Sequence, residues 1–350
     1  MIRALARVCA RFLVLLALSS MLIFVVLRAA PGNPARVALG VSASDEDIAQ
    51  LSAALGLDRP LLVQYWDWVS GLLRGDFGVS LVSQENITPL VLDRAQVSLI
   101  LVGLAMALSL LIAVPVGTWL AYRQAKLDAA VLSGLVQLGI AVPSFLLAIV
   151  LVAIFAVHLG WLPAGGWLPP KYGFGGFLSH LVLPVFSLAL VQAAILTRYV
   201  RSAVLEVIEQ DYLRTARASG DTELQALRRH GLRNATLPVL TVAGVQLATL
   251  VASAVVIERV FVIPGLSSML LDAVHARDLP TVQSLVMVLV FFTLVVTLVV
   301  DLAYRIVDPR LRRNSGVRNG VRNGVRRSFR RQAQRGRQTA TSKQKRAARS

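Results

Sequence analysis

Long apolar stretches, each separated from the next by a more polar segment, set the pattern of this chain. Each stretch has about 20 residues or more, enough for a helix to cross a hydrocarbon core about 30 Å thick. Lipid offers no partner for an unpaired backbone amide, and the stretches lack the alternation of a closed barrel, so we expect helices. The sequence therefore predicts an all-α membrane protein of about six transmembrane helices, near residues 12–30, 97–122, 129–159, 181–199, 237–257 and 282–304.

The first stretch is open to a second interpretation as a signal peptide. Arg3, Arg7 and Arg11 would form its basic region, and the sequence at 28–30 resembles a weak cleavage site. The apolar run of 12–27 is long for a signal peptide, however, and five further stretches follow. We therefore favour a retained first helix. Prolines inside the later stretches predict local kinks, at Pro115, Pro143 and Pro184.

Composition agrees with a membrane location. Of 350 residues, 56% are hydrophobic and 16% are charged, against about 25% charged in an ordinary soluble domain. The single cysteine, Cys9, excludes an internal disulfide framework and a cysteine-based metal cluster. The four histidines show no metal-binding spacing. We expect no metal site and no cofactor in this chain.

The distribution of charge predicts the orientation. Basic residues concentrate in the segment 1–11, the loop 200–236 and the tail 305–350, whereas the loop 31–96 carries four Arg against eight acidic residues. Because Lys and Arg favour the cytoplasmic side, both termini and the loop 200–236 are predicted to be cytoplasmic and the loop 31–96 external. The net charge of +17 is then mainly a topology signal.

The tail, 305–350, repeats Gly-Val-Arg-Asn and has few apolar residues to bury. Such composition is typical of disorder. Its sixteen Lys and Arg suit contact with anionic membrane lipids better than a role in nucleic-acid binding, and we expect no nucleic-acid partner.

The predicted spans contain almost no ionisable residues. Asp301, near the cytoplasmic end of the last span, is the one acidic exception. A secondary carrier usually needs an ionisable group at membrane depth to couple ions to substrate. The chain also lacks the Gly-x-x-x-x-Gly-Lys-Ser/Thr phosphate loop, so the energy for driven transport must come from another subunit. A pore or carrier, and a membrane-embedded enzyme or scaffold, remain as alternative classes.

The loop 200–236 has the pattern of a helical hairpin. Leu205, Ile208, Tyr212 and Ala216 are spaced for one helical face, and Gly220 interrupts the pattern. Thr222 and Gln225 then resemble a capping box that opens a second helix. Pattern alone leaves two interpretations open: a docking hairpin for a partner, or an amphipathic hairpin that rests on lipid headgroups.

Several segments resemble the permeases of ABC importers, in particular the dipeptide, oligopeptide and nickel branch. The run 211–220 (DYLRTARASG) with 232–238 (LRNATLP) is similar to their coupling loop, with Thr215-Ala216 where other importers have Glu-Ala. Further matching motifs lie at 55–60, 63–66, 71–80, 141–145, 258–265 and 307–310, and the resemblance covers roughly residues 10–312.

The resemblance implies an ABC importer type I permease fold over residues 97–304 and a role as a non-enzymatic membrane subunit. It implies a heterodimer with a second permease, two ATPase subunits that bind the ATP, and an extracytoplasmic binding protein in a bacterial cytoplasmic membrane. Small peptides are the favoured cargo, with nickel chelates, glutathione or sugars as alternatives. The residues that would couple to the ATPase are Asp211, Tyr212, Arg214, Thr215, Ala216, Arg217, Ala218, Gly220, Leu237 and Pro238.

Overall fold

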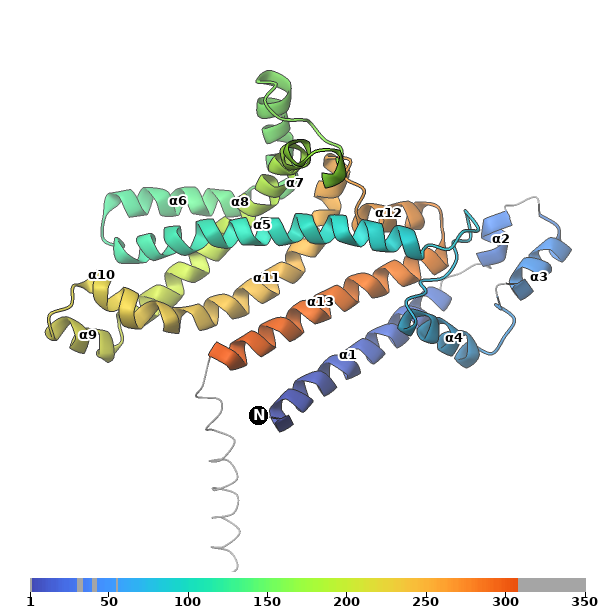
Figure 1. Ribbon diagram of the computed structural model, residues 1–350, viewed down its shortest axis with the longest axis horizontal. Coiled ribbons are helices and arrows are strands. Elements are labelled where there is room, and N and C mark those ends of the chain that lie inside the picture. The colour runs from blue at the N-terminus through green and yellow to red at the C-terminus, as the bar shows by residue number, and fades with distance from the viewer. Residues whose placement is uncertain (1, 30–33, 40–42, 55, 308–350) are drawn as a thin grey trace, which may run out of the picture.

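Five helices in the described residues are each long and apolar enough to cross a membrane. The computed structural model describes residues 2–29, 34–39, 43–54 and 56–307. The spanning helices, which lie side by side along the long axis in Figure 1, are α1 (Ile2–Arg28), α5 (Thr88–Tyr122), α8 (Phe174–Ile208), α11 (Leu232–Val260) and α13 (Leu279–Val307). They confirm the predicted all-α membrane protein. Beyond residue 307 the predicted disordered tail lies outside the described residues.

The third predicted span is not one straight helix. It consists of α6 (Leu127–Ala141), α7 (Ser144–Leu151) and the π-helix η1 (Val152–His158), and the two halves meet at an angle of 100°. The break falls at Val142, which is extended, and Pro143. Proline disfavours a helical residue before it and cannot donate to the helix. The predicted kink at Pro143 is therefore a full break, whereas α5 and α8 continue through Pro115 and Pro184.

The core of the bundle lies where α5, α8 and α11 pack together. Leu101, Leu188, Leu196 and Ile257 are fully buried there. Residues with small side chains let the helices approach closely: a Cβ added at Gly117 would lie 2.8 Å from the carbonyl oxygen of Thr197. Close backbone approach at small residues is typical of packing between membrane helices.

Short helices cover one end of the bundle. They are α2 (Pro34–Leu39), α3 (Asp45–Ala54), α4 (Leu61–Leu73) and α12 (Leu266–His275), and the first three fall within the segment predicted as an external loop. At the opposite end lie α9 (Asp211–Ala218) and α10 (Glu223–Ala226) (Figure 1).

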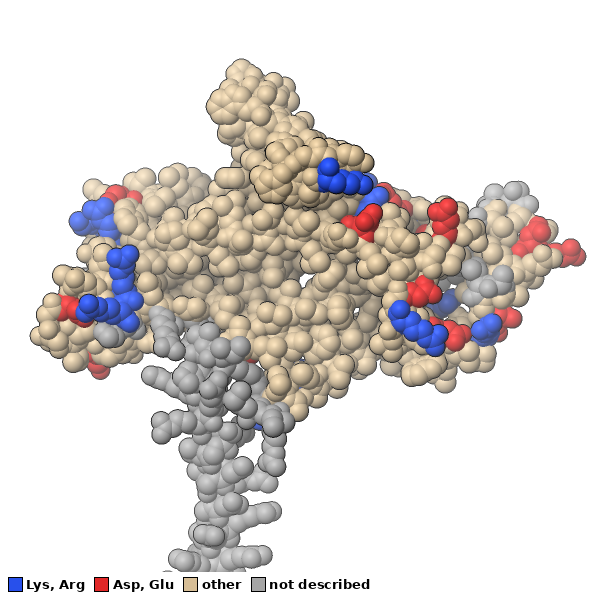
Figure 2. All heavy atoms as spheres, viewed as in Figure 1, with Lys and Arg blue, Asp and Glu red and all other residues tan. Residues whose placement is uncertain are grey.

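Charged side chains on the face shown in Figure 2 gather mainly at these two ends. Basic and acidic residues lie both near α9 and α10 and around α2–α4, and most of the surface between these ends is uncharged. An uncharged band between two charged ends matches the hydrocarbon layer and its two polar boundaries.

Candidate functional site

The predicted hairpin forms at one end of the bundle, but its first arm is shorter than expected. Helix α8 ends at Ile208, and Gln210 is extended before α9 begins at Asp211. The prediction that Leu205, Ile208, Tyr212 and Ala216 share one face of a single helix is therefore wrong. The break at residues 209–210 turns α9 away from α8, because an extended residue cannot continue the helical ladder.

Helix α9 ends in a Schellman motif centred on Gly220. The Gly220 N–H donates to the Arg217 carbonyl at 3.1 Å, and the Asp221 N–H donates to the Ala216 carbonyl at 3.2 Å. Gly220 has φ +105°, a conformation that residues with a Cβ rarely adopt. The predicted helix break at Gly220 is confirmed, with a defined geometry.

The second arm of the hairpin begins with the predicted capping box. The Gln225 N–H donates to Thr222 Oγ1 at 3.4 Å, and the Thr222 N–H donates to Gln225 Oε1 at 3.0 Å. Helix α10 then runs without a gap through the π-helix η3 (Leu227–Gly231) into α11. The second arm is therefore continuous with a spanning helix, which the prediction of a span beginning at residue 237 did not include.

The hairpin is fixed to the bundle by apolar and polar contacts. Leu213 is buried against the core cluster, and Ala226 and Leu227 are buried opposite it. The Asn234 side-chain amide donates to the Tyr212 hydroxyl at 2.9 Å, which joins α9 to α11. The residue that anchors α9 is thus Leu213, which the sequence analysis did not select.

Most of the predicted coupling residues lie on the exposed face of α9. Ala216 is the exception, since it is partly buried and packs against the core cluster. A large residue at Ala216 would therefore disturb internal packing, and its place on a docking face stays a prediction. Pro238 is exposed within α11, while the side chain of Leu237 lies outside the described residues. The exposed members of the set are Asp211, Tyr212, Arg214, Thr215, Arg217, Ala218 and Gly220.

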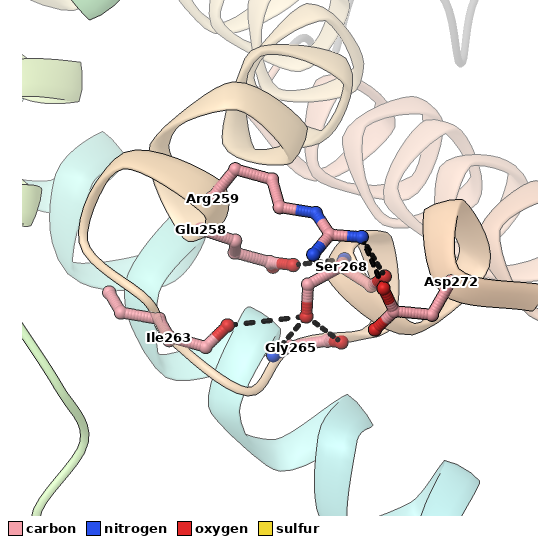
Figure 3. Close-up of polar contacts among 6 residues, drawn as sticks. All are labelled: Glu258, Arg259, Ile263, Gly265, Ser268 and Asp272. Carbon is pink, nitrogen blue, oxygen red and sulfur yellow. Dashed lines mark hydrogen bonds and ion pairs between the residues drawn. The ribbon is translucent and has the colours of Figure 1, made fainter. Parts of the chain in front are cut away.

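A second polar arrangement lies at the other end of α11 and was not selected from the sequence. The Glu258 side chain is fully buried; Ser98 Oγ on α5 donates to its Oε1 at 2.6 Å, and the Ser268 N–H on α12 donates to its Oε2 at 2.9 Å. Ser98 Oγ also accepts the Leu266 N–H at 2.8 Å. Next to it, Arg259 pairs with Asp272 across the same turn (Figure 3).

This Glu258 network satisfies the first backbone donors of α12 with a buried carboxylate. A negative group at a helix N-terminus is favourable both for the unpaired N–H groups and for the helix dipole. The network therefore joins α5, α11 and α12. The sequence signal for this network is the carboxylate that directly follows an apolar span, at the start of the segment 258–265.

A second buried carboxylate, Asp278, holds the other end of α12. It accepts the Ser80 hydroxyl at 2.6 Å, the Leu81 N–H at 3.1 Å and the Thr281 hydroxyl at 2.6 Å. These contacts join the turn between α12 and α13 to the segment that precedes α5. Both ends of α12 are therefore fixed by buried carboxylates.

Within the described residues, no three His, Cys, Asp or Glu side chains converge in a way that could hold a metal ion. The exposed charged pair on α9, Asp211 and Arg214, lies 3.8 Å apart and is open to solvent. What the hairpin does offer is an exposed helical surface at one end of an all-α, multi-pass membrane bundle.

Comparison with known families identifies this bundle. The model of the family "Binding-protein-dependent transport system inner membrane component" matches residues 113–313. The model of the N-terminal part of the same transport-system membrane component matches residues 1–102. The chain belongs to the family of binding-protein-dependent transport system inner membrane components, and the ABC importer permease recognised from its motifs is confirmed.

Similar proteins of known name fall in the same group. A putative peptide transport system permease protein of Brucella abortus is 40% identical over 294 residues, which cover 84% of this chain and 93% of the relative. The oligopeptide transport system permease protein AppB of Bacillus subtilis is 36% identical over 296 residues, with 83% and 93% covered. In fold, the chain is similar to an inward-facing MetNI methionine ABC transporter chain, with a TM-score of 0.51, 19% identity, and 63% of this chain and 98% of that chain covered.

Proposed function

We propose that this chain is the permease subunit of an ATP-driven importer that moves small peptides across the cytoplasmic membrane. The observation that carries the proposal is the α9–α10 hairpin, an exposed surface element whose residues resemble the coupling loop of such permeases. The names of the two relatives above, each a peptide permease that this chain matches over most of its length, support peptides as the cargo.

Other subunits would supply the energy and the first recognition of substrate. The sequence has no phosphate-binding loop of its own. We assign ATP binding and hydrolysis to two ATPase subunits beneath the hairpin, and substrate delivery to a binding protein on the opposite side. A second, different permease chain would complete the pathway. No covalent chemistry is assigned to this chain.

The charge asymmetry of the sequence supports the orientation. The hairpin lies in the Arg-rich segment 200–236, and α2–α4 lie in the acidic segment 31–96. On the positive-inside rule, the hairpin end faces the cytoplasm, where ATP is available, and the α2–α4 end faces outward.

The continuity of α10, η3 and α11 gives the hairpin a route for transmitting motion. A partner that moves α9 also moves the second arm, since Leu213 packs against the core and the Tyr212 hydroxyl accepts from Asn234 of α11. The second arm cannot shift without α11, because no loop separates them. A rigid-body tilt of α11 is the kind of change that alternates a packed bundle between two arrangements.

A substitution at Gly220 tests the coupling. Gly220→Val places a β-branched residue at φ +105°, which costs on the order of 1–3 kcal/mol and displaces the turn. No atom lies within 4 Å of the position of a Cβ there, so the effect comes from the backbone and not from a clash. In the reconstituted complex, we expect ATP hydrolysis to continue while uptake of a labelled dipeptide falls about tenfold or more.

Gly78→Val is the matched control. Gly78 has φ +92° and likewise has open space around its Cβ position, but it lies at the α2–α4 end. This variant bears a similar backbone strain far from the hairpin and should retain coupling. Equal coupling of uptake to hydrolysis in the Gly220→Val variant and the wild type would overturn the assignment of the hairpin. Coupled uptake of a nickel chelate but of no peptide would overturn the assignment of peptides as the cargo and leave the coupling role of the hairpin in place.

A further inference from the structure

A cavity of about 620 Å³ lies between α1, α3 and α4, away from the coupling hairpin. Apolar side chains from α1 and α4 form much of its lining, including Phe24, Val25 and Leu61. Arg28, the last residue of α1, and Asp58, just before α4, add one positive and one negative group. The cavity is thus largely apolar with two opposite charges.

Unsatisfied polar atoms concentrate at this junction. Of the five buried side-chain nitrogen and oxygen atoms without a hydrogen-bond partner among the described residues, three belong to Arg28, Gln64 and Trp68. The guanidinium of Arg28 lies 5.5 Å from the centre of the Phe24 ring. No ion pair joins it to Asp58 or to any other acidic residue in the described part of the chain. Buried polar groups in native proteins are nearly always paired, so the unpaired atoms of the two lining residues, Arg28 Nε and Gln64 Oε1, favour an external partner.

The residues around the cavity are those expected at the depth of the lipid headgroups. Arg28 ends a 24-residue apolar span, and Leu22 and Val26 on the same helix are more than half exposed, as expected for a lipid-facing surface. Helix α4 exposes Leu62, at 82%, and Trp66, at 67%. Exposed tryptophan and leucine on a short helix beside the end of a span are typical of an element lying in the membrane interface.

We propose that this cavity binds one phospholipid of the outer leaflet with an ethanolamine headgroup. The Arg28 guanidinium donates to the lipid phosphate, because its planar set of N–H donors matches the geometry of a phosphate group. The Asp58 carboxylate accepts from the headgroup ammonium, and the first part of an acyl chain lies along Phe24, Val25 and Leu61. A headgroup with both charges matches the cavity, whereas phosphatidylglycerol would leave Asp58 beside an anionic lipid with no cation.

Native mass spectrometry of the purified full-length chain tests this assignment. At one equivalent of phosphatidylethanolamine, the wild type should retain a single lipid, and Arg28→Gln should weaken retention about tenfold or more because a charge-assisted hydrogen bond is lost. Asp58→Asn should remove the preference for phosphatidylethanolamine over phosphatidylglycerol while keeping phospholipid binding. Circular dichroism and gel filtration check that each variant is folded.

Arg74→Gln is the matched control, because Arg74 is an exposed arginine directly after the other end of α4. Its lipid retention should stay within about twofold of the wild type. Equal retention by the Arg28→Gln and Arg74→Gln variants, or no retained lipid in the wild type, would overturn the proposal. Competition by soluble glycerophosphoethanolamine as strong as that by the lipid would exclude the acyl-chain contact and with it the phospholipid. The experiment requires no transport, so its failure leaves the proposed function untouched.

Discussion

Ser98→Ala is the substitution that most directly tests the Glu258 network. Ser98 Oγ donates to Glu258 Oε1 at 2.6 Å and accepts the Leu266 N–H at 2.8 Å. All three residues are buried. Removing one hydroxyl therefore leaves a carboxylate oxygen and a backbone N–H without these partners, in a place where the smaller side chain changes little else.

The size of the effect follows from these two orphaned groups. Leaving a buried donor or acceptor unsatisfied costs about 1–3 kcal/mol, and more where the group is charged. Glu258 keeps the Ser268 N–H, so its charge retains one strong partner. We expect a total loss of about 3 kcal/mol in the free energy of unfolding, which corresponds to a fall of about 4 °C in the melting temperature of a chain of this size.

Thermal unfolding of the purified chain in detergent measures this loss. Ser253→Ala is the matched control on α11, because the Ser253 hydroxyl donates only to the Thr249 carbonyl one turn earlier in the same helix. The control should change the melting temperature by about 1–2 °C at most. If the Ser98→Ala variant has the same melting temperature as the control, the view that the network stabilises the fold is refuted.

Three further predictions concern packing, the turn between α12 and α13, and topology. Gly117→Ala places a Cβ 2.7 Å from Val200 Cβ and should destabilise the chain by about 1–3 kcal/mol, whereas Gly103→Ala on the same helix meets no atom within 4 Å and should be neutral or stabilising in the same melting assay. Asp278→Ala removes the acceptor for the Ser80 hydroxyl and should speed proteolysis of the segment before α5, unlike a change at the exposed Asp67. Reporter fusions within 221–225 should read cytoplasmic and fusions within 45–54 external, and the reverse result would overturn the orientation.

The helices and the hairpin turn could be predicted because their signals are local. Length and hydropathy define a span, and a glycine after a short amphipathic run defines a helix end, whatever the rest of the chain does. The capping box of Thr222 and Gln225 formed as predicted for the same reason. The buried face of α9 could not be predicted in this way. The extended residue Gln210 starts a new helix with its own orientation, so Leu213 points inward in place of Tyr212.

The buried carboxylates could not be predicted, because their partners lie far away in the sequence. Glu258 and Ser98 are separated by 160 positions, and Asp278 and Ser80 by 198. In sequence, each acid follows or precedes a span and resembles the solvated charges that normally flank one. Only the packing of α5, α11 and α12 shows that no water-facing side remains for Glu258, which is fully buried.

The two carboxylates also explain how a bundle can move at one end and stay rigid at the other. Glu258 fixes the start of α12 to α5 and α11, and Asp278 fixes its end to α13 and to the segment before α5. Several helices at the α2–α4 end are therefore joined through buried, charge-assisted hydrogen bonds, which are about twice as strong as neutral ones. Among the described residues, the α9 hairpin is held by apolar contacts and by the Tyr212–Asn234 hydrogen bond, with no buried carboxylate, so we expect less energy to resist its displacement. A force applied at the hairpin should then tilt α11 about its Glu258 end without separating it from α12.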